Sequence, residues 1–155
     1  MVNAYSRLTS AVLAGATSIT VPNVSELALP AAACPGGGCS LPLAAGDLLM
    51  IYQPQGVTTF ASSDNVGYGA VSDLGSAGKY EFVYVRGFGA DPTTQIELAR
   101  TSLDGNDCAG LRNAYTIGGT GVAPAMVIRV PQYQNLTVDA GATLAAAEWN
   151  WNSAA

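Results

Sequence analysis

The chain has 155 residues, enough for one domain that buries about 70% of its unfolded surface. Only 11% of its residues are charged, against about 25% in an average soluble domain, and its formal net charge is −5. The six basic residues are scattered singly, whereas nucleic-acid binding needs clustered positive charge to replace phosphate counterions. No apolar run approaches the roughly 18 residues of a spanning helix. We therefore expect neither nucleic-acid binding nor membrane insertion.

The predicted elements are short strands. In chain order, β-branched or alternating apolar runs lie at 18–21, 48–53, 80–88, 95–99 and 125–130. The continuous run "LLMIYQ" at 48–53 predicts a strand that is buried on both faces. Segment 24–33 has room for one or two helical turns. The last strand candidates are 136–138 and 142–147.

The clearest alternation lies in "YEFVYVRGF" at 80–88. Because successive side chains of a strand point to opposite faces, Tyr80, Phe82 and Tyr84 should share one face. The other face should carry Glu81 and the two valines that follow it at alternate positions.

Turn-forming residues separate these runs, as in "GADP" at 89–92 and "GGTG" at 118–121. Strands spaced about ten residues apart, with no long 3.6-residue period, predict an all-β fold. We expect an antiparallel β-sandwich or Greek-key barrel with long surface loops, in a single domain over 1–155. The polar stretch 56–79 should be a surface excursion, where binding often resides.

The three cysteines bear on the cellular compartment. Cys34 and Cys39 flank "PGGG", and Cys108 lies in a second turn-rich loop. Zinc needs four ligands and the chain has no histidine, so a structural metal is not expected. A disulfide between Cys34 and Cys39 is the favoured interpretation, with Cys108 as an alternative partner for either. The competing interpretation is three reduced thiols in a cytosolic protein.

Catalytic residues are not evident. Without histidine, the usual general base and the Ser-His-Asp and Cys-His arrangements are missing. Glu81 stands out because it lies inside an aromatic strand. It is either a catalytic or ligand carboxylate or, as we favour, a strand residue paired with Arg129 or Arg86. We predict that the chain is not an enzyme and uses no cofactor.

The loop "DGND" at 104–107 has a weak similarity to a calcium loop, with Asp104, Asn106 and Asp107 as candidate ligands. An EF-hand loop has a further acidic position and ends in a bidentate Glu, and both are missing here. A simple turn is therefore the default interpretation of this segment.

Aromatic side chains form the remaining candidate site. Trp149 and Trp151 would face the same side of a strand, as a sugar-stacking platform or, more often, as a plug for a core or an interface. Together with Tyr68, Tyr80 and Tyr84 they are the candidate ligand or interface residues.

Five stretches, taken together and in order, resemble a known family. They are "LAAGDLLMIYQPQG", "YGAV", "AGKYEFVYV", "CAGLRNAY" and "MVIRVPQYQNLTVDAGATLAAAEWN". This ordered set is similar to the N-terminal module of large secreted surface proteins of gliding and predatory bacteria, such as adventurous-gliding-motility-type proteins and related long adhesins. The resemblance covers about residues 16–150 and implies an extracellular, β-rich structural module. The family continues into a glycine-rich stretch, where this chain has "EWNWNSAA".

We therefore expect an extracellular structural or adhesive module that packs against copies of itself or a cell surface, as a filament subunit formed by strand complementation. The end segments 1–15 and 142–155 are the candidate assembly or linker segments, with 5–15 and 142–151 as the candidate donated strands. The alternative is a carbohydrate-binding module that uses exposed aromatic side chains.

Overall fold

The computed structural model describes residues 3–30, 40–60, 67–99, 110–118 and 123–135, together with 137, 138, 140, 141, 143 and 145. Within this part of the chain the regular structure is all β, apart from one 3-10 turn, η1 (Val24–Leu27). The predicted all-β, antiparallel fold is confirmed.

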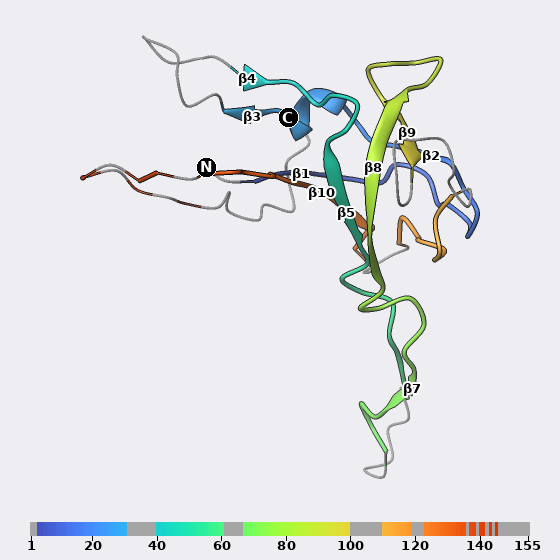
Figure 1. Ribbon diagram of the computed structural model, residues 1–155. Coiled ribbons are helices and arrows are strands. Elements are labelled where there is room, and N and C mark those ends of the chain that lie inside the picture. The colour runs from blue at the N-terminus through green and yellow to red at the C-terminus, as the bar shows by residue number, and fades with distance from the viewer. Residues whose placement is uncertain are drawn as a thin grey trace.

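Six strands form one sheet in the order β1-β10-β5-β8-β9-β2, with every neighbouring pair antiparallel (Figure 1). The sheet curls like half of a barrel, so that β1 and β10 run across the direction of β5 and β8 in Figure 1. Its strands are β1 (Ala4–Arg7), β2 (Ser18–Thr20), β5 (Leu48–Tyr52), β8 (Tyr80–Phe88), β9 (Gln95–Ala99) and β10 (Met126–Val130).

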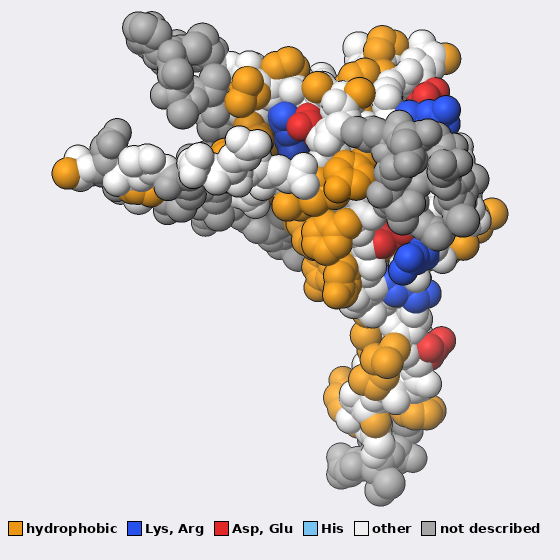
Figure 2. Space-filling model, in the orientation of Figure 1, with side chains coloured by type: hydrophobic (Ala, Val, Ile, Leu, Met, Phe, Trp, Pro, Cys, Tyr) orange, Lys and Arg blue, Asp and Glu red, His pale blue; other side chains and the backbone are white. Residues whose placement is uncertain are grey.

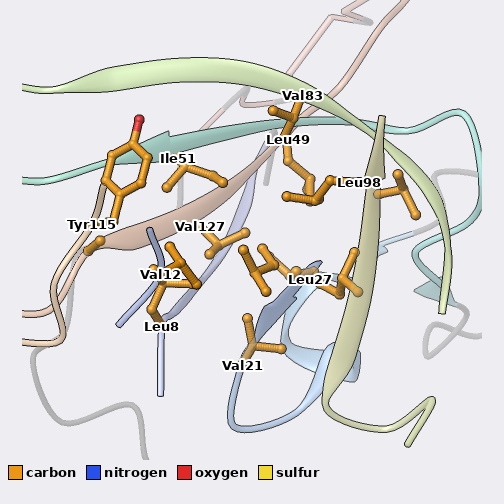
Figure 3. Close-up of a cluster of buried hydrophobic side chains, with 14 of the residues drawn as sticks. Leu8, Val12, Val21, Leu27, Leu49, Ile51, Val83, Leu98, Tyr115 and Val127 are labelled. Atoms are coloured by element: carbon orange, nitrogen blue, oxygen red, sulfur yellow. The ribbon is translucent and has the colours of Figure 1, made fainter. Parts of the chain in front are cut away.

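The hydrophobic core fills the concave side of this sheet (Figure 3). Strand alternation supplies one half of the core, from side chains that include Leu49, Ile51, Val83, Val85, Ile96, Leu98 and Val127. Irregular segments and η1 supply the other half, and the residues involved include Leu8, Val12, Val21, Leu27, Leu43, Leu111 and Tyr115. The second layer is therefore mostly loops, which are long enough to close the open side of the curled sheet.

A tight turn joins β8 to β9. The carboxylate of Asp91 accepts hydrogen bonds from the Thr93 amide (3.0 Å), the Thr93 hydroxyl (2.6 Å) and the Thr94 hydroxyl (2.9 Å). These hydrogen bonds lower the pKa of Asp91, since they favour its charged form. The "GADP" stretch is thus a turn, as predicted.

Two small ribbons extend from the body, and the chain beyond β10 also runs away from it (Figure 1). One ribbon pairs β3 (Leu29–Pro30) with β4 (Ser40–Leu41). The other pairs β6 (Thr58–Thr59) with β7 (Val71–Asp73) inside the predicted surface excursion 56–79. It continues past the ends of β5 and β8, away from η1.

Strand prediction is accurate where the pattern is strong. The runs 80–88 and 95–99 coincide with β8 and β9, and the other three central runs contain β2, β5 and β10 within one residue at each end. Of the predicted one or two helical turns at 24–33, the described residues 24–30 contain one, η1. Thr137 and Val138 are exposed and are not in a strand, so the strand predicted at 136–138 is wrong for these two residues.

The double-sided burial predicted for 48–53 is also incorrect. In β5, Leu49 and Ile51 are fully buried, whereas Leu48, Met50 and Tyr52 are only partly buried. No second layer among the described residues covers the face of β5 that carries these three side chains. Among the described residues, the core accounts for the apolar character of only one face of β5.

Candidate functional site

The convex side of the sheet carries an apolar array, defined here by three residues on each of three neighbouring strands. The register aligns them in rows across β10, β5 and β8, so that side chains in a row stand side by side. The rows are Met126–Tyr52–Tyr80, Ile128–Met50–Phe82 and Val130–Leu48–Tyr84. None of the nine side chains is charged. The array is a continuous hydrophobic surface about three strands wide.

The β8 side of this array is the most exposed. Tyr80 is 60% and Phe82 is 47% exposed, and their rings pack edge to face with centroids 6.1 Å apart. Figure 2 shows hydrophobic side chains gathered over the β5–β8 region, and more of them along the projecting ribbon. A contiguous apolar surface of this kind is typical of an interaction site, whereas scattered exposed hydrophobic residues are normal.

Two cations stand on the same convex face, at opposite ends of the array. Arg7 on β1 is aligned with Met126, and Arg86 follows Tyr84 at the next outward position of β8. Both are exposed, and neither forms an ion pair within the described part of the chain. The array is therefore uncharged at its centre, with Arg7 at one margin and Arg86 at the other, where the exposed Glu97 of β9 lies opposite Gly87.

The β6–β7 ribbon, taken as residues 57–60 and 67–74, is the second apolar feature. Its pairing extends from the Thr58–Asp73 pair to the Phe60 amide, which donates to the Ala70 carbonyl (2.9 Å). All of its large apolar side chains are exposed, including Leu74 (67%) and Phe60 (55%); the others are Val57, Tyr68 and Val71. None belongs to the core cluster. An isolated two-stranded ribbon is marginally stable in water, so this one lacks the packing that such a ribbon needs.

The base of the ribbon continues the β5–β8 ladder. The Gln53 amide donates to the Lys79 carbonyl, and the Gly78 amide donates to the Gln53 carbonyl, both at 2.9 Å. Above this base the backbone at Gly75 (φ +55°) approaches Gly56 so closely that a Cβ atom at Gly75 would collide with the Gly56 carbonyl oxygen. The direction of the ribbon is therefore set by the sheet itself.

Glu81 is buried on the concave side, opposite the array. Its carboxylate accepts hydrogen bonds from the amides of Arg112 (2.8 Å) and Asn113 (3.0 Å) and from the Tyr115 hydroxyl (3.0 Å). The predicted pairing of Glu81 with Arg129 or Arg86 is therefore wrong. These partners belong to the loop that covers the core, which gives Glu81 a structural role.

Tyr115 is buried beside Glu81. Burial raises the pKa of its phenol above the usual range, because the interior disfavours the charged form, and the carboxylate of Glu81 acts in the same direction. A neutral phenol that donates to a carboxylate is a stable buried pair. Neither group has the open, solvent-reachable geometry of a catalytic residue.

Gln53, directly after β5, binds the same loop that Glu81 of the neighbouring strand β8 binds. Its side chain donates to the Ala123 carbonyl (3.1 Å) and accepts from the Thr116 amide (2.9 Å) while fully buried. Gln53 and Glu81 together fasten the segment from 110 to 125 across the core. This fixes the concave face and leaves the convex face as the accessible one.

Arg129 takes its partners from other segments. Its guanidinium pairs with Asp47 (2.8 Å) and donates to the carbonyls of Leu27 (3.1 Å) and Leu41 (2.7 Å). It therefore links β10 to η1 and to β4, near the base of the β3–β4 ribbon.

The structure separates the aromatic candidates predicted from sequence. Tyr80 and Tyr84 lie on the array, and Tyr68 lies on the ribbon. The other candidates lie outside the described residues: Cys34, Cys39, Cys108, Asp104, Asn106, Asp107, Trp149 and Trp151. In the described ranges no three His, Cys, Asp or Glu side chains are grouped so that they could hold a metal ion. The same ranges contain no helix that is long and apolar enough to cross a membrane.

Sequence reasoning missed most of the array. Its unpredicted members are Leu48, Met50, Tyr52, Met126, Ile128 and Val130. The signal was present, because β5 is apolar on both faces and β10 is apolar at each of its outward positions. Only the alignment of the strands shows that these positions form one surface.

Comparison with models of known protein families, with curated proteins and with solved structures finds no match to this chain. The resemblance to surface modules of gliding bacteria therefore stays a prediction.

Proposed function

We propose that this chain is a non-enzymatic structural subunit of an extracellular or cell-surface assembly, and that it packs against copies of itself. The observation that carries the proposal is the apolar array on the convex face of the sheet. Nine uncharged side chains are aligned there on three strands, and no described segment covers them.

The energetic argument follows from apolar area. Burying hydrophobic surface is favourable by about 25 cal/mol per Å², so covering this face stabilises any complex that achieves it. The pattern of β5 supports the same conclusion. A strand that is apolar on both faces is typical of a sheet with a layer on each side, and the described residues supply a layer on one side of β5.

Charge supports contact through this face rather than another. Each copy has a net charge of −5, so copies repel one another on average. The array has no acidic side chain, and the charges at its margins are Arg7 and Arg86, with the exposed Glu97 of β9 opposite Gly87 and so close to Arg86. Contact there avoids most of the like-charge repulsion between copies.

Packing through a face differs from the predicted strand donation at the N-terminus. Within 5–15, β1 is paired to β10 and Val12 is bridged to Tyr115 in the same chain. The proposed assembly leaves this pairing intact. The low charge content of the chain, which is common in extracellular β-proteins, supports a location outside the cytosol.

A second proposal is carbohydrate binding through the same face. Tyr52, Tyr80, Phe82 and Tyr84 present aromatic rings on adjacent strands, and such rings provide a flat, partly polar surface. Quenching of intrinsic fluorescence by a panel of soluble glycans, lost in Tyr80→Ala, would support it. Unchanged fluorescence across the panel would argue against it.

The first proposal is tested by size-exclusion chromatography with light scattering, over a range of concentrations, with and without reductant. We expect species larger than the 15.7 kDa chain, and their persistence in reductant would indicate surface packing. Species that collapse on reduction would instead be linked by cysteine. A monomer at every concentration would contradict the proposal.

A further inference from the structure

We infer that the array of one copy is covered by the β6–β7 ribbon of a second copy, so that subunits join head to tail. This inference rests on the proposed self-assembly and names the partner segment. The ribbon is the described part of 57–74, and the array is the set of nine residues defined above.

The ribbon and the array have similar widths. The array spans three strands, so its outer strand axes are about 10 Å apart. A two-stranded ribbon with its side chains has a comparable width. Laid on the array, it completes a local sandwich in which both faces of β5 are buried.

Each surface lacks what the other offers. The ribbon is held together by few backbone hydrogen bonds and exposes Phe60, Val71 and Leu74 without any core of its own. The array is part of the six-stranded sheet, and no described segment forms a second layer over it. Packing the ribbon on the array gives the ribbon an apolar surface to pack against and covers the exposed side chains of the array.

The ribbon is directed away from the array of its own chain. Its base continues the β5–β8 ladder at Gln53 and Lys79, beyond the end of the array marked by Tyr52 and Tyr80 (Figure 1). Covering its own array would require the ribbon to fold back through this ladder. A neighbouring copy can receive it without any such change.

The charges near this contact are few. The ribbon carries Asp73, on the same strand face as Val71. The array is bordered by Arg7 and by Arg86, with the exposed Glu97 of β9 close to Arg86. The proposed contact is therefore mainly apolar.

The test is a complementation experiment with full-length chains. Phe82→Glu places a charge in the middle of the array, and Phe60→Glu places one on the ribbon. Leu13→Glu is the matched control, because Leu13 is 77% exposed and belongs to neither surface. Circular dichroism and thermal unfolding establish that each variant is folded. Tyr80→Glu, at a strand end, is a second array variant in case Phe82→Glu is not folded.

We expect either variant alone to associate at least about tenfold more weakly than the parent chain, while Leu13→Glu associates normally. Mixing the two variants should restore one contact, between the intact ribbon of Phe82→Glu and the intact array of Phe60→Glu. The product should be a dimer of twice the 15.7 kDa chain mass that grows no further.

The alternatives give different results. If Phe60→Glu assembles like the parent chain while Phe82→Glu does not, the ribbon is not the partner, although self-assembly stands. If the mixture stays monomeric, the head-to-tail contact is likewise refuted. A parent chain that is monomeric throughout would remove both the proposed function and this inference.

Discussion

Glu81 enters the interior near the start of β8, as its second residue, and accepts hydrogen bonds from two backbone amides and one phenol. In Glu81→Gln, one carboxylate oxygen becomes an NH₂ group that faces those donors. We expect the free energy of unfolding to fall by about 2 kcal/mol, the scale of hydrogen bonds to a charged group. Urea denaturation at neutral pH measures this change.

Glu97→Gln is the matched control, because Glu97 lies on the neighbouring strand β9 and is exposed. We expect its stability to stay within about 0.5 kcal/mol of the parent chain, as is usual for surface substitutions. Equal effects of the two substitutions would contradict the structural role assigned to Glu81.

Because of Tyr115, we expect the free energy of unfolding to decrease at alkaline pH. Its folded-state pKa is raised, chiefly by burial, whereas the unfolded chain ionises near pH 10. The unfolded state therefore loses its proton first, so stability is complete below pH 10 and decreases as pH rises above it. We expect urea denaturation at pH 8 and pH 10.5 to show a smaller decrease in Tyr115→Phe than in the parent chain. Identical decreases would contradict the prediction.

The orientation of Glu81 was predictable from sequence, but its partners were not. Strict alternation over 80–88 places Glu81 on the same face as Val83 and Val85, and all three are buried. Two of its partners are the backbone amides of Arg112 and Asn113, which lie 31 and 32 positions further along the chain. Every residue except proline has a backbone amide, so the sequence does not indicate which amides will bind a buried carboxylate. Arginine side chains were the visible candidates, which explains the incorrect pairing.

At the scale of elements, Arg129 connects three segments that are far apart in the chain. Arg129→Met removes the partner of Asp47 and two hydrogen bonds to buried or partly buried carbonyls. We expect a loss of about 2 kcal/mol in the free energy of unfolding, because two carbonyls lose their charged donor and Asp47, whose side chain is 27% exposed, loses its partner. Arg7→Met, at an exposed site of β1, should change stability by less than about 0.5 kcal/mol in the same denaturation assay. Similar losses in both would contradict this account.

The ribbon should be separable from the fold. Gly56 and Gly75 lie in close contact at its base, so a two-residue Asn-Gly turn can replace 57–74. Since none of the large apolar side chains of the ribbon is part of the core, we expect this chain to unfold within a few degrees of the parent in thermal melts. In light scattering it should be monomeric. A shortened chain that still assembles would show that the ribbon is dispensable for contact.

Elements were predictable in proportion to their length. The five- and nine-residue strands carry enough alternation to be recognised, as β8 and β9 show. Strands β3, β4 and β6 have two residues each and depend on their partners, so no local pattern marks them. The ribbon at 57–74 was recognised only as a surface excursion because its apolar residues are interspersed with Gly, Ser and Thr.

For the whole molecule, a face covered by another copy makes stability depend on protein concentration. Association favours the folded state by mass action, so the midpoint of thermal unfolding should rise as concentration increases. We expect the midpoint of Phe82→Glu to be independent of concentration over the same range. A constant midpoint in the parent chain would indicate that folding and association are not linked.

The sheet order has a consequence for synthesis. The first strand, β1, pairs with the last, β10, and β10 is also the only described strand between β1 and β5. As the chain leaves the ribosome, β1 has no strand to join, and β5 keeps an open edge, until residue 130 has emerged. Folding of this sheet must therefore wait until β10 has been synthesised. A nascent chain that stops before Met126 loses two strands from the sheet and exposes an edge that invites aggregation.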